Sequence, residues 1–255
     1  MLYKNGLPFD ENHAKNLDAL KKRVLEDNKG GVLIFTGVVG GGKTTLAVNN
    51  ADYIAGAYEK KGKQYVLNEK LLIDFEKSIA TGSQELKTKL IKTFDEGLNY
   101  LIWDEAGDFN NRSYLTNLNK DINRLFEVSR AFKIVVFLCL PNFYVLDKNI
   151  LNVGVIQGVV FVYGRTKATA KFKVFDAEKT NRLITYMVKS VDKIKVIKNF
   201  RPNYYGYFLD LPKKRAGDLE RFSIMGKKAI VLNLFEKDKS ITTTIKGGEI
   251  VQYKE

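Results

Sequence analysis

The sequence predicts an α/β fold, in which a parallel β-sheet is covered by helices on both faces. Three observations predict it. Short apolar runs rich in β-branched and aromatic residues alternate with segments whose apolar residues recur at helical spacing. The first apolar run leads through a glycine-rich loop into a helix, and a later one ends in two acids, Asp104 and Glu105. Parallel strands joined by helices need crossovers, and each is expected to be right-handed.

The glycine-rich run at residues 37–45 fits the phosphate-binding P-loop pattern G-x-x-x-x-G-K-[ST] at every fixed position. Glycines let the backbone curl so that N–H groups face an anion, and the start of a helix adds free N–H groups and a positive dipole end. The alternative is an ordinary glycine turn between a strand and a helix. The residues expected to contact ATP are Gly37, Gly40, Gly41, Gly42, Lys43, Thr44 and Thr45.

Four side chains are expected to act on the terminal phosphate, its metal ion and the attacking water. Lys43 would reach the β- and γ-phosphates, and the Thr44 hydroxyl would bind Mg²⁺ together with Asp104. Glu105, one residue further on, would orient and deprotonate the attacking water, which favours an ATP hydrolase over a kinase. The alternative is that the two acids are solvated residues in a strand-to-loop turn.

The elements expected in the first two thirds of the chain alternate between strand and helix. A stripe of apolar residues predicts the first helix, and each strand is an apolar run bounded by polar or glycine-bearing residues. In order we expect a helix at 11–28, a strand at 31–36, the P-loop helix to about 59, a second strand at 64–68, a helix at 83–96, a strand at 99–105, a helix at 120–132, a strand at 133–140, a short helix at 147–151 and a strand at 157–164.

The pattern changes beyond residue 165. Residues 167–175 alternate small or apolar with basic residues, which is typical of an exposed hairpin strand. Residues 201–208 are aromatic and irregular, and 229–235 and 241–253 are expected to be strands. The sequence therefore predicts an ATPase core with an N-terminal helix at 1–175 and a small, basic, β-rich C-terminal extension at 176–255.

Composition limits the classes of protein to which the chain can belong. The chain has 255 residues, 45% hydrophobic and 28% charged, as expected for a globular protein. The single cysteine, Cys139, excludes an internal disulfide, and with the single histidine, His13, it cannot form a zinc site. Cys139 lies in an apolar run and is expected in the core. We expect no leader and no membrane span, hence a cytoplasmic protein, in the host cytoplasm or the virion if the protein is viral.

Positive charge is concentrated in the last third of the chain. The net charge is +13, and residues 165–255 contain 21 Lys or Arg against 10 Asp or Glu, so they contribute +11. Such asymmetry favours a polyanionic partner such as nucleic acid over a merely Lys-rich surface. We expect double-stranded DNA, contacted through its backbone.

Several further residues are candidates for contact with the γ-phosphate or the attacking water. An arginine, often from a neighbouring subunit, commonly stabilises the transition state of phosphoryl transfer. Candidates are Arg112, Arg124, Arg130 and Arg165. Asn142, just after the fourth expected strand, could hydrogen-bond the attacking water or the γ-phosphate, or it could be a turn residue after Pro141.

Residues 122–136 resemble the segment of the FtsK/HerA superfamily of DNA-pumping ATPases in which a helix ending in Arg-Ala leads into the fourth strand. Trp103 to Ala106 resembles the superfamily's hydrophobic-Asp-Glu strand end, and Leu140 to Asn142 with residues 146–150 its polar residue and short helix. The resemblance covers about residues 30–165. The length is also similar to that of viral genome-packaging ATPases and Zot-like phage proteins, although the Zot-like branch normally adds a membrane span.

The resemblance implies a RecA-like core of the ASCE type with strand order 5-1-4-3-2, a homo-oligomeric ring, expected to be a hexamer, and Arg130 acting in trans. It implies an ATP-hydrolysing DNA translocase or packaging motor of a virus or mobile element, with Mg²⁺ as its metal. The superfamily commonly has Gln where this chain has Asn142. The alternatives are an ATPase that loads or remodels replication proteins on DNA, and a Zot-like ATPase of virion or pilus assembly that binds protein; a small-molecule kinase is disfavoured by Glu105.

Overall fold

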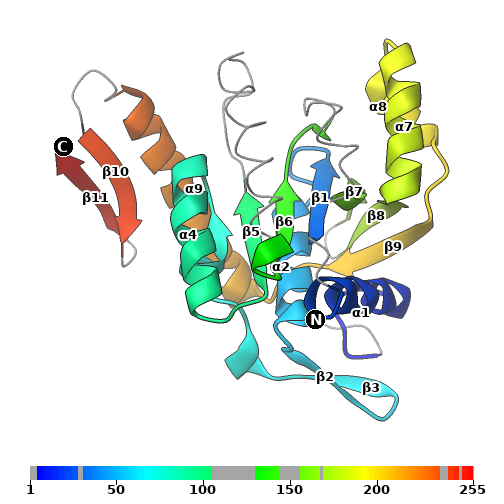
Figure 1. Ribbon diagram of the computed structural model, residues 1–255, viewed down its shortest axis with the longest axis horizontal. Coiled ribbons are helices and arrows are strands. Elements are labelled where there is room, and N and C mark those ends of the chain that lie inside the picture. The colour runs from blue at the N-terminus through cyan, green and yellow to red at the C-terminus, as the bar shows by residue number, and fades with distance from the viewer. Residues whose placement is uncertain are drawn as a thin grey trace.

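The structure is a computed structural model that describes residues 5–27, 31–104, 130–143, 156–166, 169–235, 241–246 and 249–254. Within these residues a seven-stranded sheet forms the centre of the molecule (Figure 1). Its strands lie in the order β4 (Ile79–Ala80), β5 (Tyr100–Asp104), β6 (Val135–Cys139), β1 (Gly31–Gly37), β7 (Ile156–Arg165), β8 (Thr169–Asp176) and β9 (Tyr204–Leu209). The first five are parallel, whereas β8 and β9 are antiparallel to their neighbours.

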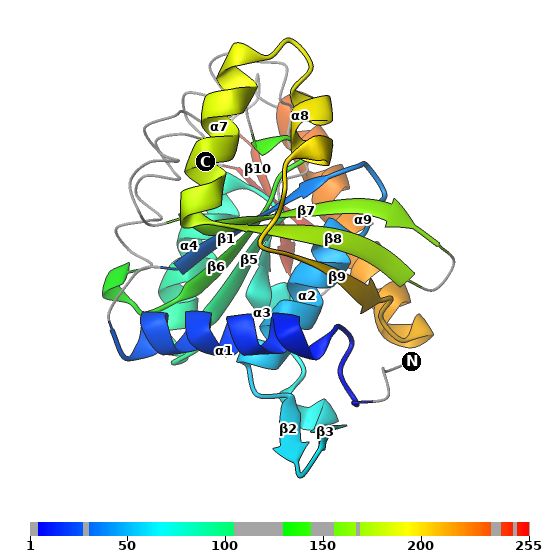
Figure 2. The same cartoon turned by 90° about the vertical axis from the view of Figure 1, so that its right-hand side faces the viewer.

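Helices cover both faces of this sheet, as the alternation of strands and helices predicts. The face with α1 and α2 and the face with α4, α7 and α8 each carry an apolar cluster, and α9 contributes Leu219 and Phe222 to the first. Figure 2 shows α1 on one side of strands β7 to β9 and α7 and α8 on the other. The helices are α1 (Glu11–Leu25), α2 (Lys43–Ile54), α3 (Phe75–Ser78), α4 (Ser83–Asp95), α7 (Ala177–Lys189), α8 (Lys193–Asn199) and α9 (Lys213–Phe235), with a short 3-10 helix η1 (Glu69–Leu71).

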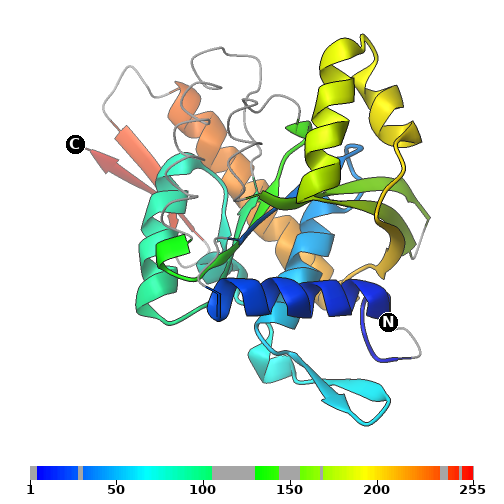
Figure 3. The ribbon, with the colours of Figure 1, turned by 45° about the vertical axis from the view of Figure 1, so that its right-hand side comes forward.

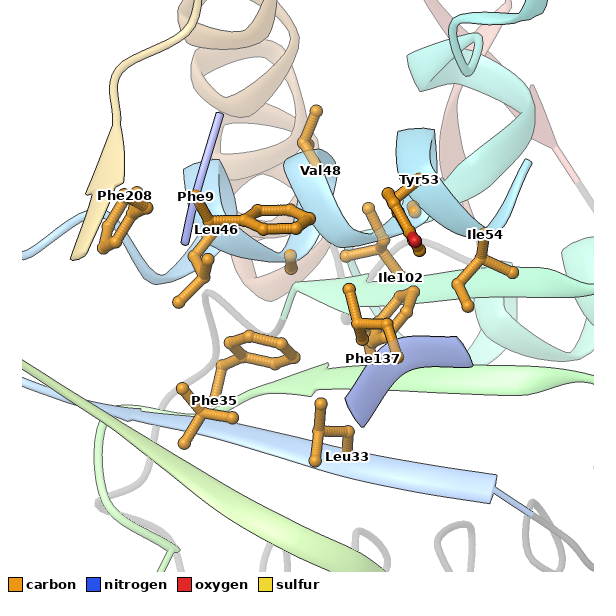
Figure 4. Packing of buried hydrophobic residues seen from close by; sticks show 14 of the residues in the cluster. Phe9, Leu33, Phe35, Leu46, Val48, Tyr53, Ile54, Ile102, Phe137 and Phe208 are labelled. Atoms are coloured by element: carbon orange, nitrogen blue, oxygen red, sulfur yellow. The ribbon is translucent and has the colours of Figure 1, made fainter. Parts of the chain in front are cut away.

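The central strands are buried on both faces because helices cover each side. The first six residues of β1 are buried, as are all residues of β6. Figure 4 shows Leu33 and Phe35 of β1 facing Leu46 of the overlying α2, with Phe137 of β6 beside them. Burying an apolar side chain of this size contributes roughly 1.5–3 kcal/mol, so this layer holds α2 firmly on the sheet.

Helix α1 has a clear start and a buried stripe. The side chain of Asp10 accepts a hydrogen bond from the His13 backbone N–H at 3.0 Å, which caps the helix. Its buried residues, at helical spacing, are His13, Ala14, Leu17, Leu20 and Val24. No helix in the described part of the chain is both long and apolar enough to span a membrane.

Residues 64–68, expected as the second strand of the sheet, do not join it. They contribute β3 (Gln64–Leu67), which in the described part of the chain forms a separate two-stranded antiparallel hairpin with β2 (Tyr58–Lys61). Figure 3 shows this hairpin extending away from the sheet. The run is too polar for a strand buried on both faces, and Gly62, with φ +63°, closes a tight local turn instead. The edge position beside β5 is taken by β4. The five parallel strands, numbered in chain order, therefore lie in the expected order 5-1-4-3-2, but the second strand is formed by residues 79–80 and not by 64–68.

The segment predicted as an exposed hairpin strand at 167–175 contains β8, which pairs antiparallel with β7 as a hairpin strand should. The predicted exposure is wrong, because β8 lies between β7 and β9 and most of its residues are buried. Strand β9 comes from the aromatic segment that the sequence marks as irregular. Strand pairing therefore continues across the boundary expected between residues 175 and 176.

The C-terminal extension is not mainly β-rich, because 177–189, 193–199 and 213–235 are helices. Residues 229–235, expected as a strand, are the last turns of α9. Leu219 and Phe222, three residues apart, pack that helix onto the core. This tertiary packing outweighs the strand preference of the β-branched residues at the end of the helix. Residues 241–253, expected as strand, form two antiparallel strands, β10 (Ile241–Lys246) and β11 (Glu249–Lys254), so the strand prediction is confirmed but the chain turns back between them.

Candidate nucleotide-binding site

The parallel strands bring the glycine loop and the predicted metal-binding acid to one edge of the sheet. Cys139, the last residue of β6, pairs with Phe35 of β1 on one side and with Asp104 of β5 on the other. The loop that follows β1 therefore begins beside Asp104, although 60 residues separate Thr44 from that acid. Ligand sites of open α/β sheets lie at this carboxyl edge.

The loop between β1 and α2 has a backbone that its glycines make possible. Gly37, Gly40 and Gly42 have φ angles of +133°, +71° and +92°, in the region that L-residues with a side chain rarely adopt. At Gly37 a Cβ atom would also lie 2.0 Å from the carbonyl oxygen of Val162 in β7. Gly41 donates its N–H to the Val38 carbonyl at 3.1 Å, which closes the turn.

Lys43 and Thr45 lie in the first turn of α2 and are half-buried. The Lys43 ammonium donates to the carbonyl oxygens of Gly37 at 3.3 Å and Val38 at 3.1 Å, so its charge is held against the loop. Burial lowers the pKa of Lys43, and the nearby Cys139 and Asp104 oppose that shift. A cation with incomplete solvation, next to a loop whose backbone can curl round an anion, is the arrangement that a phosphate site requires.

Thr44 and Asp104, the two residues expected to bind magnesium, are in direct contact. The Thr44 Oγ1 hydroxyl donates to Oδ2 of Asp104 at 3.1 Å. A hydroxyl and a carboxylate are hard oxygen ligands of the kind that Mg²⁺ prefers alongside phosphate oxygens and water. The donor set therefore fits a magnesium ion, and Thr44 and Asp104 are the residues that would hold it.

The other predicted site residues differ in where they lie. Glu105 is outside the described residues, as are Arg112 and Arg124. Asn142 is half-buried just after β6, where the Thr36 hydroxyl donates to the Pro141 carbonyl at 3.1 Å, and it is therefore at the same edge of the sheet as the loop.

Arg130 is exposed and precedes β6, so it lies near the amino ends of the parallel strands, whereas Lys43 lies near their carboxyl ends. It cannot reach the glycine loop of its own chain. Any contact between Arg130 and a bound nucleotide would have to be made in another subunit.

One arginine does reach the loop within the chain. Arg165, at the end of β7, donates through Nη1 to the Gly40 carbonyl at 3.2 Å and through Nη2 to Asp210 Oδ1 at 2.7 Å. The guanidinium also lies close to Gly42, because a Cβ atom added to that glycine would be 3.3 Å from Arg165 Nη1. Sequence reasoning proposes Arg165 only as one arginine of several and misses Asp210, because nothing in the spacing shows that β9 ends near the end of β7, with β8 between them.

Helix α2 is also held by three polar contacts, two of them fully buried, that the sequence does not reveal. They tie the helix to α1, β9 and α9, which come from both ends of the chain. The contacts are Asn50 Oδ1 with His13 Nε2 at 3.0 Å, Asn49 Nδ2 with the Leu209 carbonyl at 3.1 Å, and Asp52 Oδ1 with Arg215 Nη2 at 2.6 Å.

Comparison with known proteins adds little to this geometry. No family model matches the chain, and no curated protein matches it. Among solved structures, the flagellar accessory protein FlaH from Methanocaldococcus jannaschii aligns over 62% of this chain and 83% of its own, with 13% identity and a TM-score of 0.30. A likeness this weak carries no argument about function, and membership of the FtsK/HerA superfamily stays a prediction. The strand–glycine loop–helix unit and the Thr44–Asp104 contact themselves indicate a fold of the P-loop NTPase kind.

Proposed function

We propose that this protein is a magnesium-dependent ATP hydrolase. The observation that carries the proposal is the meeting of Thr44 with Asp104 beside the curled loop that holds Lys43. Magnesium, when bound, would neutralise the charge that develops on the phosphates. Lys43 and the N–H groups of the loop would hold the phosphate oxygens, and Glu105 would take the proton of the attacking water.

Three substitutions separate binding from hydrolysis. Lys43→Ala is expected to weaken ATP binding, Asp104→Asn to raise the magnesium concentration needed for turnover, and Glu105→Gln to keep binding while lowering the hydrolysis rate by about 10²-fold or more. Isothermal titration with a non-hydrolysable analogue and a phosphate-release assay measure the two properties. Matched controls are Lys61→Ala and Glu69→Gln, which remove a charge of the same kind from exposed positions outside the proposed site. Normal turnover by both Lys43→Ala and Glu105→Gln would end the proposal.

We further propose that hydrolysis is coupled to the movement of double-stranded DNA, by a ring-shaped oligomer in which Arg130 of one subunit acts on the nucleotide of the next and Asn142 contacts the attacking water or the γ-phosphate. The charge of +11 on residues 165–255 supports a polyanionic partner, and the exposed position of Arg130 away from its own loop is compatible with action in trans. Contacts to the DNA backbone suit a motor because they carry no sequence information, and their affinity should fall steeply with salt.

A translocation assay on long duplex DNA separates this function from its alternatives. A motor moves processively and hydrolyses ATP faster when DNA is present. An ATPase that loads replication proteins would show the stimulation without processive movement. An ATPase of virion or pilus assembly that binds protein would show neither. The oligomer mass, with and without nucleotide analogue and DNA, tests the ring.

A further inference from the structure

Tyrosine and lysine side chains share one face of strands β7 to β9. In the register of the sheet, Lys171 of β8 lies between Tyr163 of β7 and Tyr207 of β9, and Lys173 pairs with Tyr205. Successive residues of a strand point to opposite faces, and the residues between them on β8 are buried on the α1 and α2 face. These five residues, named here the Tyr–Lys face, therefore lie on the side of the sheet that carries α7 and α8 (Figure 2).

The Tyr–Lys face is open at Lys171 and at the two tyrosines of β9, whereas Lys173 is buried and Tyr163 is half-buried. Tyr205 is 57% exposed and Tyr207 48% exposed. The Lys173 ammonium lies 5.3 Å from the ring centroid of Tyr163 and 5.5 Å from that of Tyr205, and it also donates to the carbonyl of a residue in α8. The Lys171 ammonium lies 5.6 Å from the Tyr207 ring. Each lysine thus steadies a ring, while much of the two β9 rings stays in contact with solvent.

The surroundings of the Tyr–Lys face favour an anionic partner. Residues 177–200, which form α7 and α8 on the same side of the sheet, contain six Lys or Arg against two Asp or Glu. Asp210, which follows β9, is paired with Arg165 at 2.7 Å. Lysines placed to protect an edge strand from pairing with another chain would explain the charge, but they would not explain two exposed tyrosines beside them.

We propose that the Tyr–Lys face binds single-stranded nucleic acid by stacking unpaired bases on Tyr205 and Tyr207. Residues i and i+2 of a strand are about 7 Å apart, so the two rings can each take one base of an extended strand. Aromatic side chains on an open sheet face stack bases in this way, and the exposed Lys171 would contact a phosphate. A duplex keeps its base faces stacked on one another, so it cannot use these rings. The site goes beyond the proposed hydrolysis and does not depend on it.

The test is direct binding of short oligonucleotides to the whole protein without nucleotide. Fluorescently labelled dT12, U12 and a 12-base-pair duplex are titrated at about 50 mM salt, where phosphate contacts are weakly screened. The variant that removes both rings is Tyr205→Thr with Tyr207→Thr, because threonine keeps a high β-propensity. The control that keeps both rings is Tyr205→Phe with Tyr207→Phe. Tyr186→Ala removes a tyrosine that is 60% exposed on α7 and lies outside the Tyr–Lys face.

We expect dT12 or U12 to bind, the threonine pair to lower that affinity by at least about tenfold, and the phenylalanine pair and Tyr186→Ala to change it by less than about twofold. The dT12 and U12 arms show whether DNA or RNA is preferred. Lys171→Gln should reduce the slope of log affinity against log salt by about 0.7. The thermal melting of each variant shows that it is folded, and if the threonine pair does not fold, the single variants Tyr205→Thr and Tyr207→Thr decide, each expected to lower the affinity.

Three outcomes would overturn the site: no binding of either single strand, equal affinity of the threonine pair and the parent protein, or duplex binding that depends equally on the two rings. Because no ATP is present, such a result would leave the proposed hydrolase intact. A failure of Glu105→Gln to affect turnover would in turn leave this site intact.

Discussion

His13 is buried between three elements, and its replacement by glutamine should change how stability depends on pH. Its ring nitrogens lie 2.8 Å from the Tyr204 hydroxyl and 3.0 Å from Asn50 Oδ1, so it ties α1 to β9 and to α2. Burial lowers the pKa of His13 from 6.5 to about 4, although Asn50 and the charge of Asp10 oppose that shift. The folded protein therefore holds this imidazole neutral in a range where the unfolded chain binds a proton.

The expected size follows from these two pKa values. Between pH 6.5 and pH 4 the unfolded chain binds more protons than the folded one at His13, so stability is lost as pH falls through this range. At pH 5 the loss relative to pH 7 is about 2 kcal/mol. Asp52 has the opposite effect on stability. Burial raises its pKa to about 6, so as the pH falls the folded protein binds a proton at Asp52 before the unfolded chain does. Acidification to pH 5 therefore adds about 1 kcal/mol of stability through this group.

Because these two effects oppose each other, the parent protein alone is a poor test. The free energy of unfolding of the parent and of His13→Gln is measured by urea titration at pH 7 and pH 5. Asp52 and all other groups contribute equally to both proteins, and His13 is the only histidine in the chain. The stability lost between pH 7 and pH 5 is therefore calculated for each protein, and the difference between the two losses is the contribution of His13. We expect the variant to lose about 2 kcal/mol less than the parent on acidification. Equal pH dependence of the two proteins would show that His13 does not fold as a buried neutral base.

Three further predictions concern the supports of the glycine loop. Gly37→Ala should destabilise the protein by roughly 2–4 kcal/mol, because a Cβ would meet a carbonyl oxygen of β7 at 2.0 Å. Gly56→Ala, at φ +87° with open space around it, should cost only about 1–2 kcal/mol, and equal losses in thermal melts would contradict the clash. Arg215→Ala should lower the free energy of unfolding by about 3–5 kcal/mol at pH 8, because it leaves Asp52 buried and charged. The loss should be smaller at pH 5, where Asp52 is protonated. Urea titrations that gave the same loss at both pH values would contradict this. Arg165→Ala should weaken nucleotide binding roughly fivefold through loss of its hydrogen bond to the loop, and unchanged affinity by calorimetry would refute that role.

The parts of the fold that the sequence predicts well have local signals. Strands β1, β5, β6 and β7 are apolar runs within a residue or two of the predicted bounds, and the P-loop pattern gives the start of α2. Cys139 is buried at the end of β6, as its apolar neighbours predict. Segments with mixed signals were predicted less well: the aromatic residues of β9 form an edge strand, and the end of α9 is helical despite its β-branched residues.

The sequence by itself determined the glycine loop, its lysine and threonine, the acids at the end of the third expected strand, and the concentration of positive charge in the last third of the chain. These are properties of residue type at fixed spacing, which can be recognised without knowing the fold. Only the tertiary structure decided that Arg165 and Asp210 reach the loop, that His13 and Arg215 hold α2, and that lysines and tyrosines from three strands share one face. Such contacts depend on strand order and helix packing, which bring together residues up to 191 positions apart and leave no mark in the local sequence.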